Sequence, residues 1–300
     1  MNDQDWSLLE AIYDEKNLTR AAEKLYISQP ALTYRIQQIE QEFGVKVIYR
    51  SNKKISFTPE GEYLVKYAKR MLLERRKTKD TVLSMSKHVQ GSLRIGCSSN
   101  FALYKLPSLI KQFLVLYPKV EVNVNTGWSS EVMKLLQNED VHVGIVTGDY
   151  KWLEKKSVIT EEPLCIISKQ PIALEDLPKL PRINYVPAKS RFNPTNPLIS
   201  KIIDNWWLER FDGPPLIIMN VDKVETCKEM VFNGLGYSII PRGALVDRDR
   251  DAFYSIDLHY TNGEALMRRT WMLYRESSLG LSAVDRFVHY VQTQYEKKIE

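Results

Sequence analysis

Hydrogen-bonding side chains crowd one face of a helix that the sequence predicts from about residue 29. Ser28 is a good N-cap, Pro30 is tolerated only in a first helical turn, and Gly44 ends the helix. An apolar stripe faces inward, which leaves six side chains on the outer face: Gln29, Pro30, Thr33, Tyr34, Arg35 and Gln37. Glutamine, threonine and arginine can bond base edges in a major groove, and tyrosine can pack on a thymine methyl group. This face therefore predicts sequence-specific contact with duplex DNA.

Two further helices are predicted before this one. Apolar residues at helical spacing between Trp6 and Tyr13 indicate the first, and Thr19 is the expected N-cap of the second, residues 20–25. Two helices joined by a three-residue turn form a helix-turn-helix, whose later helix enters the major groove. We therefore add three residues near helix starts to the set expected on DNA: Thr19, Arg20 and Ser28.

A basic hairpin is predicted after the helix-turn-helix. Residues 45–50 and 55–58 have strand character, and residues 51–54 join them. A wing in this position lies along the phosphate backbone, where Arg50, Lys53 and Lys54 would position the protein without reading sequence. The alternative is a surface hairpin whose lysines serve only solubility.

The basic charge of the chain is concentrated near this hairpin. The formal net charge is +5, and residues 1–90 hold 16 Lys and Arg against 12 Asp and Glu, hence +4. Residues 46–79 alone hold 11 basic residues against three glutamates. Such local asymmetry favours a polyanionic partner, although a solvated helix face is the alternative.

A long helix is predicted from Pro59 to about Lys87. Thr58 is its expected N-cap, and no helix breaker follows Gly61 until Gly91. Positions 64, 68, 71, 75, 78, 82 and 85 step alternately by four and three, which is a heptad seam. We expect a homodimer through four seam residues: Leu64, Met71, Val82 and Met85. Packing of this helix on its own winged domain is the alternative.

From Ser92 onward, predicted strands alternate with predicted helices. The strands are expected at residues 93–97, 120–124, 141–146, 164–167, 182–186, 216–221, 237–240 and 270–274. The helices are expected at residues 106–116, 131–136, 198–210, 224–232 and 283–295. This alternation is typical of an α/β domain with parallel sheets.

Several of these segments resemble one known family. Residues 21–33, 39–40, 43–45 and 58–61, together with Arg50, resemble the N-terminal domain of LysR-type transcriptional regulators. Thr33 stands where many members carry serine, and Ile48-Tyr49 where a phenylalanine is usual. In the second part, residues 93–96, 106–107, 117–120 and 234–241 also match the family pattern, so the resemblance covers essentially the whole chain.

The resemblance implies a domain organisation. It consists of a winged helix-turn-helix at 1–58, a dimerising linker helix at 59–90 and an effector-binding domain at 91–300. That domain is similar to periplasmic solute-binding proteins, with two α/β lobes crossed twice by the chain. We place lobe I at 91–162 and 268–300, lobe II at 163–267, and the crossings near 161–164 and 267–271. The family also implies a homotetramer, a small-molecule effector and RNA polymerase as a possible partner.

The effector is expected between the lobes. Ligands of open α/β sheets lie beyond the carboxyl ends of strands, where helix N-termini present free N–H groups. Hydroxyl, amide and charged side chains occupy such positions: Ser98, Ser99, Asn100, Trp128, Ser129, Ser130, Thr147, Lys189, Arg191, Phe192 and Glu225. Hydroxyl groups, helix N-termini and basic residues together favour a small anionic metabolite. The alternative is that serines such as Ser129 and Ser130 are only helix caps.

Other classes of function find less support. Four scattered histidines and the absence of HExxH, GxSxG, GxGxxG and P-loop motifs predict no enzyme, no cofactor and no metal. Three cysteines without a CxxC motif indicate buried thiols. Apolar runs far below about 18 residues exclude a membrane span, and the acidic N-terminus predicts a cytoplasmic protein. The alternatives left open are a small-molecule-binding protein without transcriptional control and a redox sensor.

Overall fold

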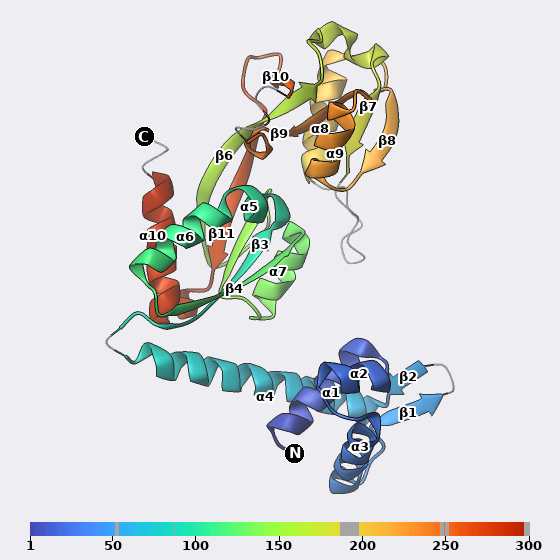
Figure 1. Cartoon of the computed structure of the whole chain (residues 1–300), viewed down its shortest axis with the longest axis vertical. Coiled ribbons are helices and arrows are strands. Elements are labelled where there is room, and N and C mark those ends of the chain that lie inside the picture. Colours follow the sequence, from blue (N-terminus) through green and yellow to red (C-terminus); the bar gives the residue numbers. More distant parts are fainter. Residues whose placement is uncertain (52–53, 87, 187–197, 247–248, 250–251, 297–300) are drawn as a thin grey trace. The chain divides into compact units, whose positions relative to one another are not determined.

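The computed structural model describes residues 1–51, 54–86, 88–186, 198–246, 249 and 252–296. The chain divides into two compact units, Met1–Leu83 and Ser84–Glu300, and each has its own hydrophobic core (Figure 1). Each unit is described by itself below. Among the described residues, no helix is long and apolar enough to cross a membrane.

The first unit is a winged helix-turn-helix, as predicted. Its elements are α1 (Asp3–Glu15), α2 (Leu18–Lys24), α3 (Gln29–Phe43), β1 (Ile48–Ser51), β2 (Lys54–Phe57) and α4 (Pro59–Ser84). Ser28 caps α3 by accepting from the Ala31 N–H at 3.3 Å, and Gly44 ends it at φ 67°. The strands β1 and β2 pair in antiparallel register to form the wing.

The start of α2 corrects one prediction. Asn17, and not Thr19, is the N-cap, because Asn17 Oδ1 accepts from the Arg20 N–H at 3.1 Å. The extended backbone of Asn17 holds this amide oxygen against the free N–H groups of the first turn. Thr19 therefore lies inside the helix, where both it and Arg20 remain exposed.

The first turns of α4 belong to the core of the first unit. Thr58 Oγ1 accepts from the Gly61 N–H at 2.9 Å and caps the helix, as predicted. Leu64 is 7% exposed and packs in the core with Ile36 and Ile39. Its expected place in a dimer seam is therefore wrong, because the winged domain needs this leucine to close its own core. The helix ends at Ser84, so Met85 also lies beyond the helical seam.

The second unit contains two α/β lobes. Lobe I is built from β3 (Gly91–Ser98), α5 (Ser99–Tyr104), α6 (Leu106–Leu116), β4 (Val120–Gly127), α7 (Ser129–Gln137), β5 (Val143–Thr147) and α10 (Ser282–Glu296). Lobe II is built from β7 (Arg182–Tyr185), α8 (Leu198–Arg210), β8 (Ile217–Val221), α9 (Val224–Phe232), β9 (Tyr237–Pro241) and β10 (Tyr254–Asp257). The long strands β6 (Lys155–Ser168) and β11 (Met267–Tyr274) run between them (Figure 1). The expected crossing segments, 161–164 and 267–271, lie in these two strands.

The sheets are only partly parallel, which corrects the prediction of parallel sheets. Strands β4, β3 and β5 of lobe I are parallel, as are β8, β7 and β9 of lobe II. However, β11 pairs antiparallel with β5, and β6 pairs antiparallel with both β9 and β11. The reason is that each crossing strand enters its sheet from the other lobe and so runs against the strands already there. The short helix α5 and the strand β10 were not predicted, because six and four residues are too few to show a period.

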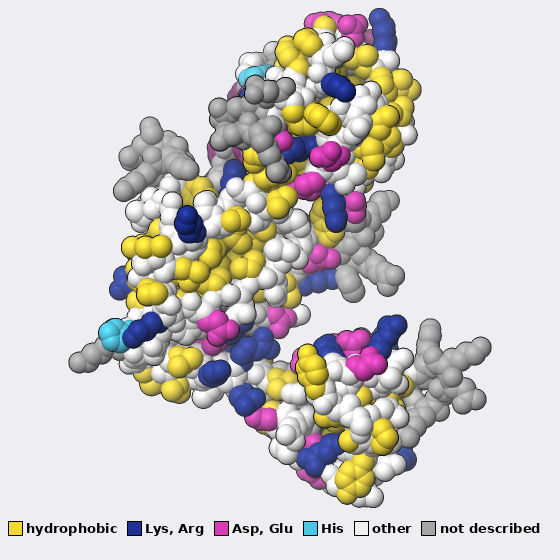
Figure 2. Space-filling view, viewed as in Figure 1, with side chains coloured by type: hydrophobic (Ala, Val, Ile, Leu, Met, Phe, Trp, Pro, Cys, Tyr) yellow, Lys and Arg dark blue, Asp and Glu magenta, His cyan; other side chains and the backbone are white. Residues whose placement is uncertain are grey.

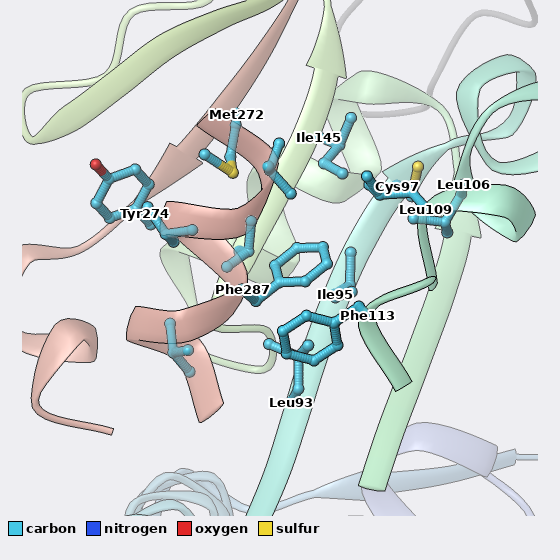
Figure 3. Packing of buried hydrophobic residues seen from close by; sticks show 14 of the residues in the cluster. Leu93, Ile95, Cys97, Leu106, Leu109, Phe113, Ile145, Met272, Tyr274 and Phe287 are labelled. Carbon is cyan, nitrogen blue, oxygen red and sulfur yellow. The ribbon is translucent and has the colours of Figure 1, made fainter. Parts of the chain in front are cut away.

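Helices cover both faces of each sheet. In lobe I, Phe113 of α6 and Phe287 of α10 meet edge to face at 5.2 Å over Leu93 and Ile95 of β3 (Figure 3). On the other face, α7 packs through a separate cluster that includes Val132. In lobe II, α8 covers one face with two buried tryptophans, and α9 covers the other. The helices α5, α7 and α9 begin directly after the carboxyl ends of the parallel strands β3, β4 and β8.

Candidate DNA-binding face and effector cleft

The outer face of α3 presents the predicted polar side chains to solvent. Gln29, Pro30, Tyr34 and Gln37 are exposed, and Thr33 is half-buried. Gln29 Nε2 donates to Thr33 Oγ1 at 3.1 Å, so these two side chains form one hydrogen-bonding surface. This arrangement offers amide, hydroxyl and aromatic groups to base edges from a single helix face.

Arg35 does not share that exposed surface. Its guanidinium forms an ion pair with Asp5 of α1, with Nη2 at 3.0 Å from Oδ2, and its Nη1 donates to Gln38 at 2.7 Å. The hydrogen bond to Asp5 raises the pKa of Arg35. Asp5 is 1% exposed and also accepts from the Asn2 N–H. Arg35 thus ties α3 to α1, so we withdraw it from the residues expected to contact bases.

The wing carries the predicted phosphate-binding residues. Arg50 lies in β1 and Lys54 in β2, whose register pairs Arg50 with Ile55. The side chains of Arg50 and Lys54, and all of Lys53, lie outside the described residues.

The second unit contains a cleft of about 840 Å³ between its lobes. Lobe I contributes residues 98–100, 126–130 and 147–150, lobe II contributes Tyr185 and residues 222–225, and β11 contributes residues 267–269. Eight of the residues predicted to contact an effector line this cleft: Ser98, Ser99, Asn100, Trp128, Ser129, Ser130, Thr147 and Glu225. Lys189, Arg191 and Phe192 lie outside the described residues.

The lobe I wall of the cleft is rich in hydroxyl groups. Thr147 Oγ1 lies 3.4 Å from Ser98 Oγ and 3.2 Å from Thr270 Oγ1, and the Thr147 N–H donates to Ser129 Oγ at 3.0 Å. Ser99 Oγ donates to the Gly127 carbonyl at 3.2 Å. These contacts hold the ends of β3, β4 and β5 together at the base of the cleft.

The start of α7 corrects a further expectation. The helix begins at Ser129 rather than at Glu131, and the Glu131 carboxylate accepts from the Trp128 N–H at 2.8 Å. Neither Ser129 nor Ser130 is therefore the N-cap of α7. The starts of α5, α7 and α9 all line the cleft, and helix N-termini carry partial positive charge and free N–H groups.

Two charged residues of the crossing strand β11, Arg268 and Arg269, also line the cleft. Glu161 forms an ion pair with Arg269, and Glu162 forms one with Lys105 at 3.0 Å. Arg268 is half-buried and lines the cleft, and its guanidinium has no ion pair or hydrogen bond with any described residue. Arg268 was not predicted as a site residue, although it lies in the expected crossing at 267–271. The sequence signal that could have identified Arg268 is its position in a strand that crosses between the lobes.

Buried aromatic hydroxyls and thiols show raised pKa values. Burial raises the pKa of Tyr185, which lines the cleft, to about 12. All three cysteines are buried and free, and burial raises the pKa of Cys165 to about 12 and of Cys227 to about 11. Because the thiolate is the reactive form, these values disfavour the redox-sensor alternative. The described residues hold no group of three or more His, Cys, Asp or Glu that could bind a metal.

A winged helix-turn-helix and a two-lobed α/β domain with a cleft define a class, the DNA-binding regulators that carry an effector domain. Residues 4–62 match the description "Bacterial regulatory helix-turn-helix protein, lysR family", and residues 86–296 match "LysR substrate binding domain". The chain belongs to the LysR family of transcriptional regulators. The resemblance drawn from the sequence is thus confirmed, and with it the function of a DNA-binding regulator.

Relatives over the full length support this assignment. The chain is 45% identical over 292 residues to the uncharacterized HTH-type transcriptional regulator YraN of Bacillus subtilis, which covers 97% of this chain and 98% of that protein. It is 30% identical over 295 residues to the regulator YkuM of the same organism, with 98% of both covered. The crystal structure of full-length CbnR with its target DNA has a TM-score of 0.69 at 20% identity and covers 98% of this chain and 99% of that one. Members of this family are transcriptional regulators and not enzymes.

Proposed function

We propose that α3 and the wing bind an operator and that a small anionic metabolite in the cleft controls this binding. The observation that carries the proposal is the convergence of hydroxyl groups, helix N-termini and the Arg268 guanidinium on one cleft. Carboxylates accept charge-assisted hydrogen bonds from such groups. A metabolite that binds two lobe arrangements unequally would shift the spacing of the paired DNA-binding domains.

Binding of DNA by named side chains is tested on an operator selected from random duplexes. Gln29, Thr33 and Tyr34 are proposed to contact bases, while Arg50, Lys53 and Lys54 contact phosphate. Removing a base contact, as in Gln29→Ala, should cost about 1–3 kcal/mol at one operator position. Lys54→Ala should lower the affinity for all duplexes by the same factor. It should also reduce the slope of log affinity against log salt concentration by about one unit. Equal loss on all sequences for Gln29→Ala would contradict its assignment.

Effector control is tested with the full chain and a panel of mono-, di- and tricarboxylates. A bound acid should raise the melting temperature and change operator affinity, and the operator should change acid affinity by the same factor. Ser99→Ala should weaken binding of the acid by about 1–3 kcal/mol, although it also removes the hydrogen bond to the Gly127 carbonyl. Ser108→Ala is the matched control, because Ser108 also donates to a backbone carbonyl, that of Lys105, but lies outside the cleft. Equal effector affinity of Ser99→Ala and wild type would move the site elsewhere.

We further propose a homodimer through α4 and a tetramer through the second unit. Val82 of α4 is exposed, and Met71 lies on the same seam. Apolar side chains gather on lobe I over α5 and α6, where Leu103, Val115 and Leu116 are exposed (Figure 2). Sedimentation of a Met71→Asp, Val82→Asp variant should show dissociation of the dimer, because unpaired charges would be buried in the seam.

RNA polymerase, the third proposed partner, is tested by transcription in vitro from the selected operator.

A further inference from the structure

The two ends of the cleft differ in chemistry. The lobe I wall presents hydroxyl groups and the start of α7, which suit an anion, beside one acid, Asp149. The lobe II wall presents three acceptors, Tyr185, Asp222 and Glu225, beside Lys223 at the start of α9. Arg268 of β11 lies on the floor beneath both walls. A ligand that spans the cleft therefore meets groups of opposite preference at its two ends.

Tyr185 is the group on the lobe II wall that the protein itself leaves unsatisfied. It is the last residue of β7, is 8% exposed and packs in the core of lobe II with Ile183 and Cys227. Its ring lines the cleft, yet its hydroxyl has no hydrogen-bond partner among the described residues. Because the Tyr185 side chain lines the cleft, its hydroxyl is available to a ligand or to water there, as acceptor or as donor.

Charged side chains act on this hydroxyl from both sides. Burial raises the pKa of Tyr185, the Arg268 charge lowers it, and the Glu225 and Asp222 charges raise it further. Glu225 is half-buried in the first turn of α9, and its carboxylate has no ion pair or hydrogen bond with a described residue. Its place in the first turn of a helix is favourable in itself. The preference of an acidic residue for a first helical turn explains Glu225 but not the unpaired hydroxyl of Tyr185.

The charge balance of the crossing strands makes Arg268 available to an anion. Glu161 and Glu162 are already paired with Arg269 and Lys105. A second, small cavity is lined by Asn100, Thr147, Arg268 and Thr270, which places the arginine next to the hydroxyl groups of lobe I. A carboxylate in the main cleft beside Arg268 would meet a guanidinium and the Thr147 hydroxyl.

We propose that the effector is a free α-amino acid. Its carboxylate binds Arg268 and the hydroxyl wall of lobe I, and its ammonium group donates to the Glu225 carboxylate and the Tyr185 hydroxyl. This inference rests on the proposed effector function of the cleft and narrows its ligand from an anion to a zwitterion. An ammonium donates three hydrogen bonds and accepts none, which matches the acceptors on the lobe II wall.

The test uses the full chain and three matched sets of compounds. The first set is the twenty amino acids of proteins, ornithine, citrulline and homoserine; the second is the 2-hydroxy acids of the same side chains; the third is the corresponding amines without a carboxylate. Calorimetry and operator affinity are measured for each. At least one amino acid should bind and change operator affinity, and its hydroxy acid and amine should bind at least 10-fold more weakly.

Variants separate the two ends of the ligand. Glu225→Gln should weaken binding of the amino acid at least 10-fold. Binding of the hydroxy acid should be unchanged or tighter, because only an ammonium group donates to the Glu225 carboxylate. Tyr185→Phe should weaken the amino acid by about 3- to 10-fold. Glu229→Gln is the control, since Glu229 lies exposed on the same helix α9 but outside the cleft. The comparison of amino acid with hydroxy acid in wild type stands even if a variant fails to fold.

The outcomes distinguish this inference from the function on which it rests. If acids without an ammonium group bind and change operator affinity while no amino acid does, the effector is not an amino acid. Control by an anionic metabolite, the proposed function, is then still supported. If no amino acid binds at all, the inference is likewise overturned, and the carboxylate panel alone decides the proposed function. Tighter binding of an amino acid to Glu225→Gln than to wild type would also refute it.

Discussion

Replacing Arg35 by alanine should destabilise the winged domain and leave its base preference intact. The substitution removes an ion pair between α3 and α1. Asp5, which is 1% exposed, would keep the Asn2 N–H at 2.7 Å as its hydrogen-bond donor. A carboxylate buried with so few donors is strongly disfavoured, so the contact between the two helices should loosen.

The magnitude follows from how far water reaches the pair. Breaking a fully buried ion pair by removing one partner costs about 3–5 kcal/mol. The Arg35 side chain is 37% exposed, so solvent screening reduces that loss. We expect a loss of about 2 kcal/mol, in the range of a hydrogen bond to a charged group. In Arg35→Ala combined with Asp5→Asn, about 1 kcal/mol should be recovered, because no charge is then left buried.

Hydrogen exchange in the full chain is the suitable assay, because it reports the local opening of α1 and α3 without isolating the domain. Gln38→Ala is the control variant. Gln38 accepts from Arg35 Nη1 at 2.7 Å, but its removal leaves the ion pair in place, so the loss should stay below about 1 kcal/mol. Operator and mutated operator duplexes are bound in parallel to measure base preference.

One result would refute the structural role of Arg35. If Arg35→Ala shows wild-type exchange in α1 and α3 but loses discrimination at one operator position, the arginine contacts a base after all. If instead exchange accelerates and affinity falls by one factor for all duplexes, the ion pair with Asp5 is its function.

Three further predictions concern other parts of the chain. Burial disfavours the ionised Glu40, but its bonds to Lys46 (2.8 Å) and to the Val47 N–H (2.9 Å) hold its pKa below the usual 4.5. The stability that these bonds provide is therefore present above pH 4.5 and lost as the pH falls through the folded value, so Glu40→Gln should flatten the pH dependence of urea unfolding below about pH 5. Gly61→Ala should lower stability by about 2–3 kcal/mol in thermal melts, because the new Cβ would lie 2.0 Å from the Val47 carbonyl oxygen; an unchanged melting temperature would contradict this geometry. Iodoacetamide should modify Cys97 and the other two buried thiols only after unfolding, as judged by mass spectrometry, and rapid labelling of the native chain would revive the redox alternative.

Local signals in the sequence were sufficient for the DNA-binding elements. Ser28, Pro30 and Gly44 act within a few residues of their own position, and the structure uses each as predicted. The same holds for Thr58 at the start of α4. Caps and turns are predictable because the groups they satisfy are neighbours along the chain. The choice between Asn17 and Thr19 was missed because both residues are good caps, two positions apart.

Partners distant in sequence were beyond such reasoning. The period of the seam placed Leu64 on an apolar face of α4, but only the folded unit shows that its own core covers that face. Arg35 has the side chain of a base-contacting residue, and only the fold brings Asp5, 30 residues earlier, against it. Helical periodicity states which side chains share a face, and it does not state what lies opposite.

The sequence by itself determined the family, the helix-turn-helix, the order of the strands and helices other than α5 and β10, and the strand ends that carry polar residues. The tertiary structure alone decided which charges are paired and which face the cleft. Thr147 and Thr270 meet although 123 residues separate them, and Arg268 is left unpaired among the described residues because Glu161 and Glu162 have other partners. Caps and periods depend on near neighbours, whereas the energy of a charge depends on its distance to others and on its burial, which exist only after the chain has crossed twice between the lobes.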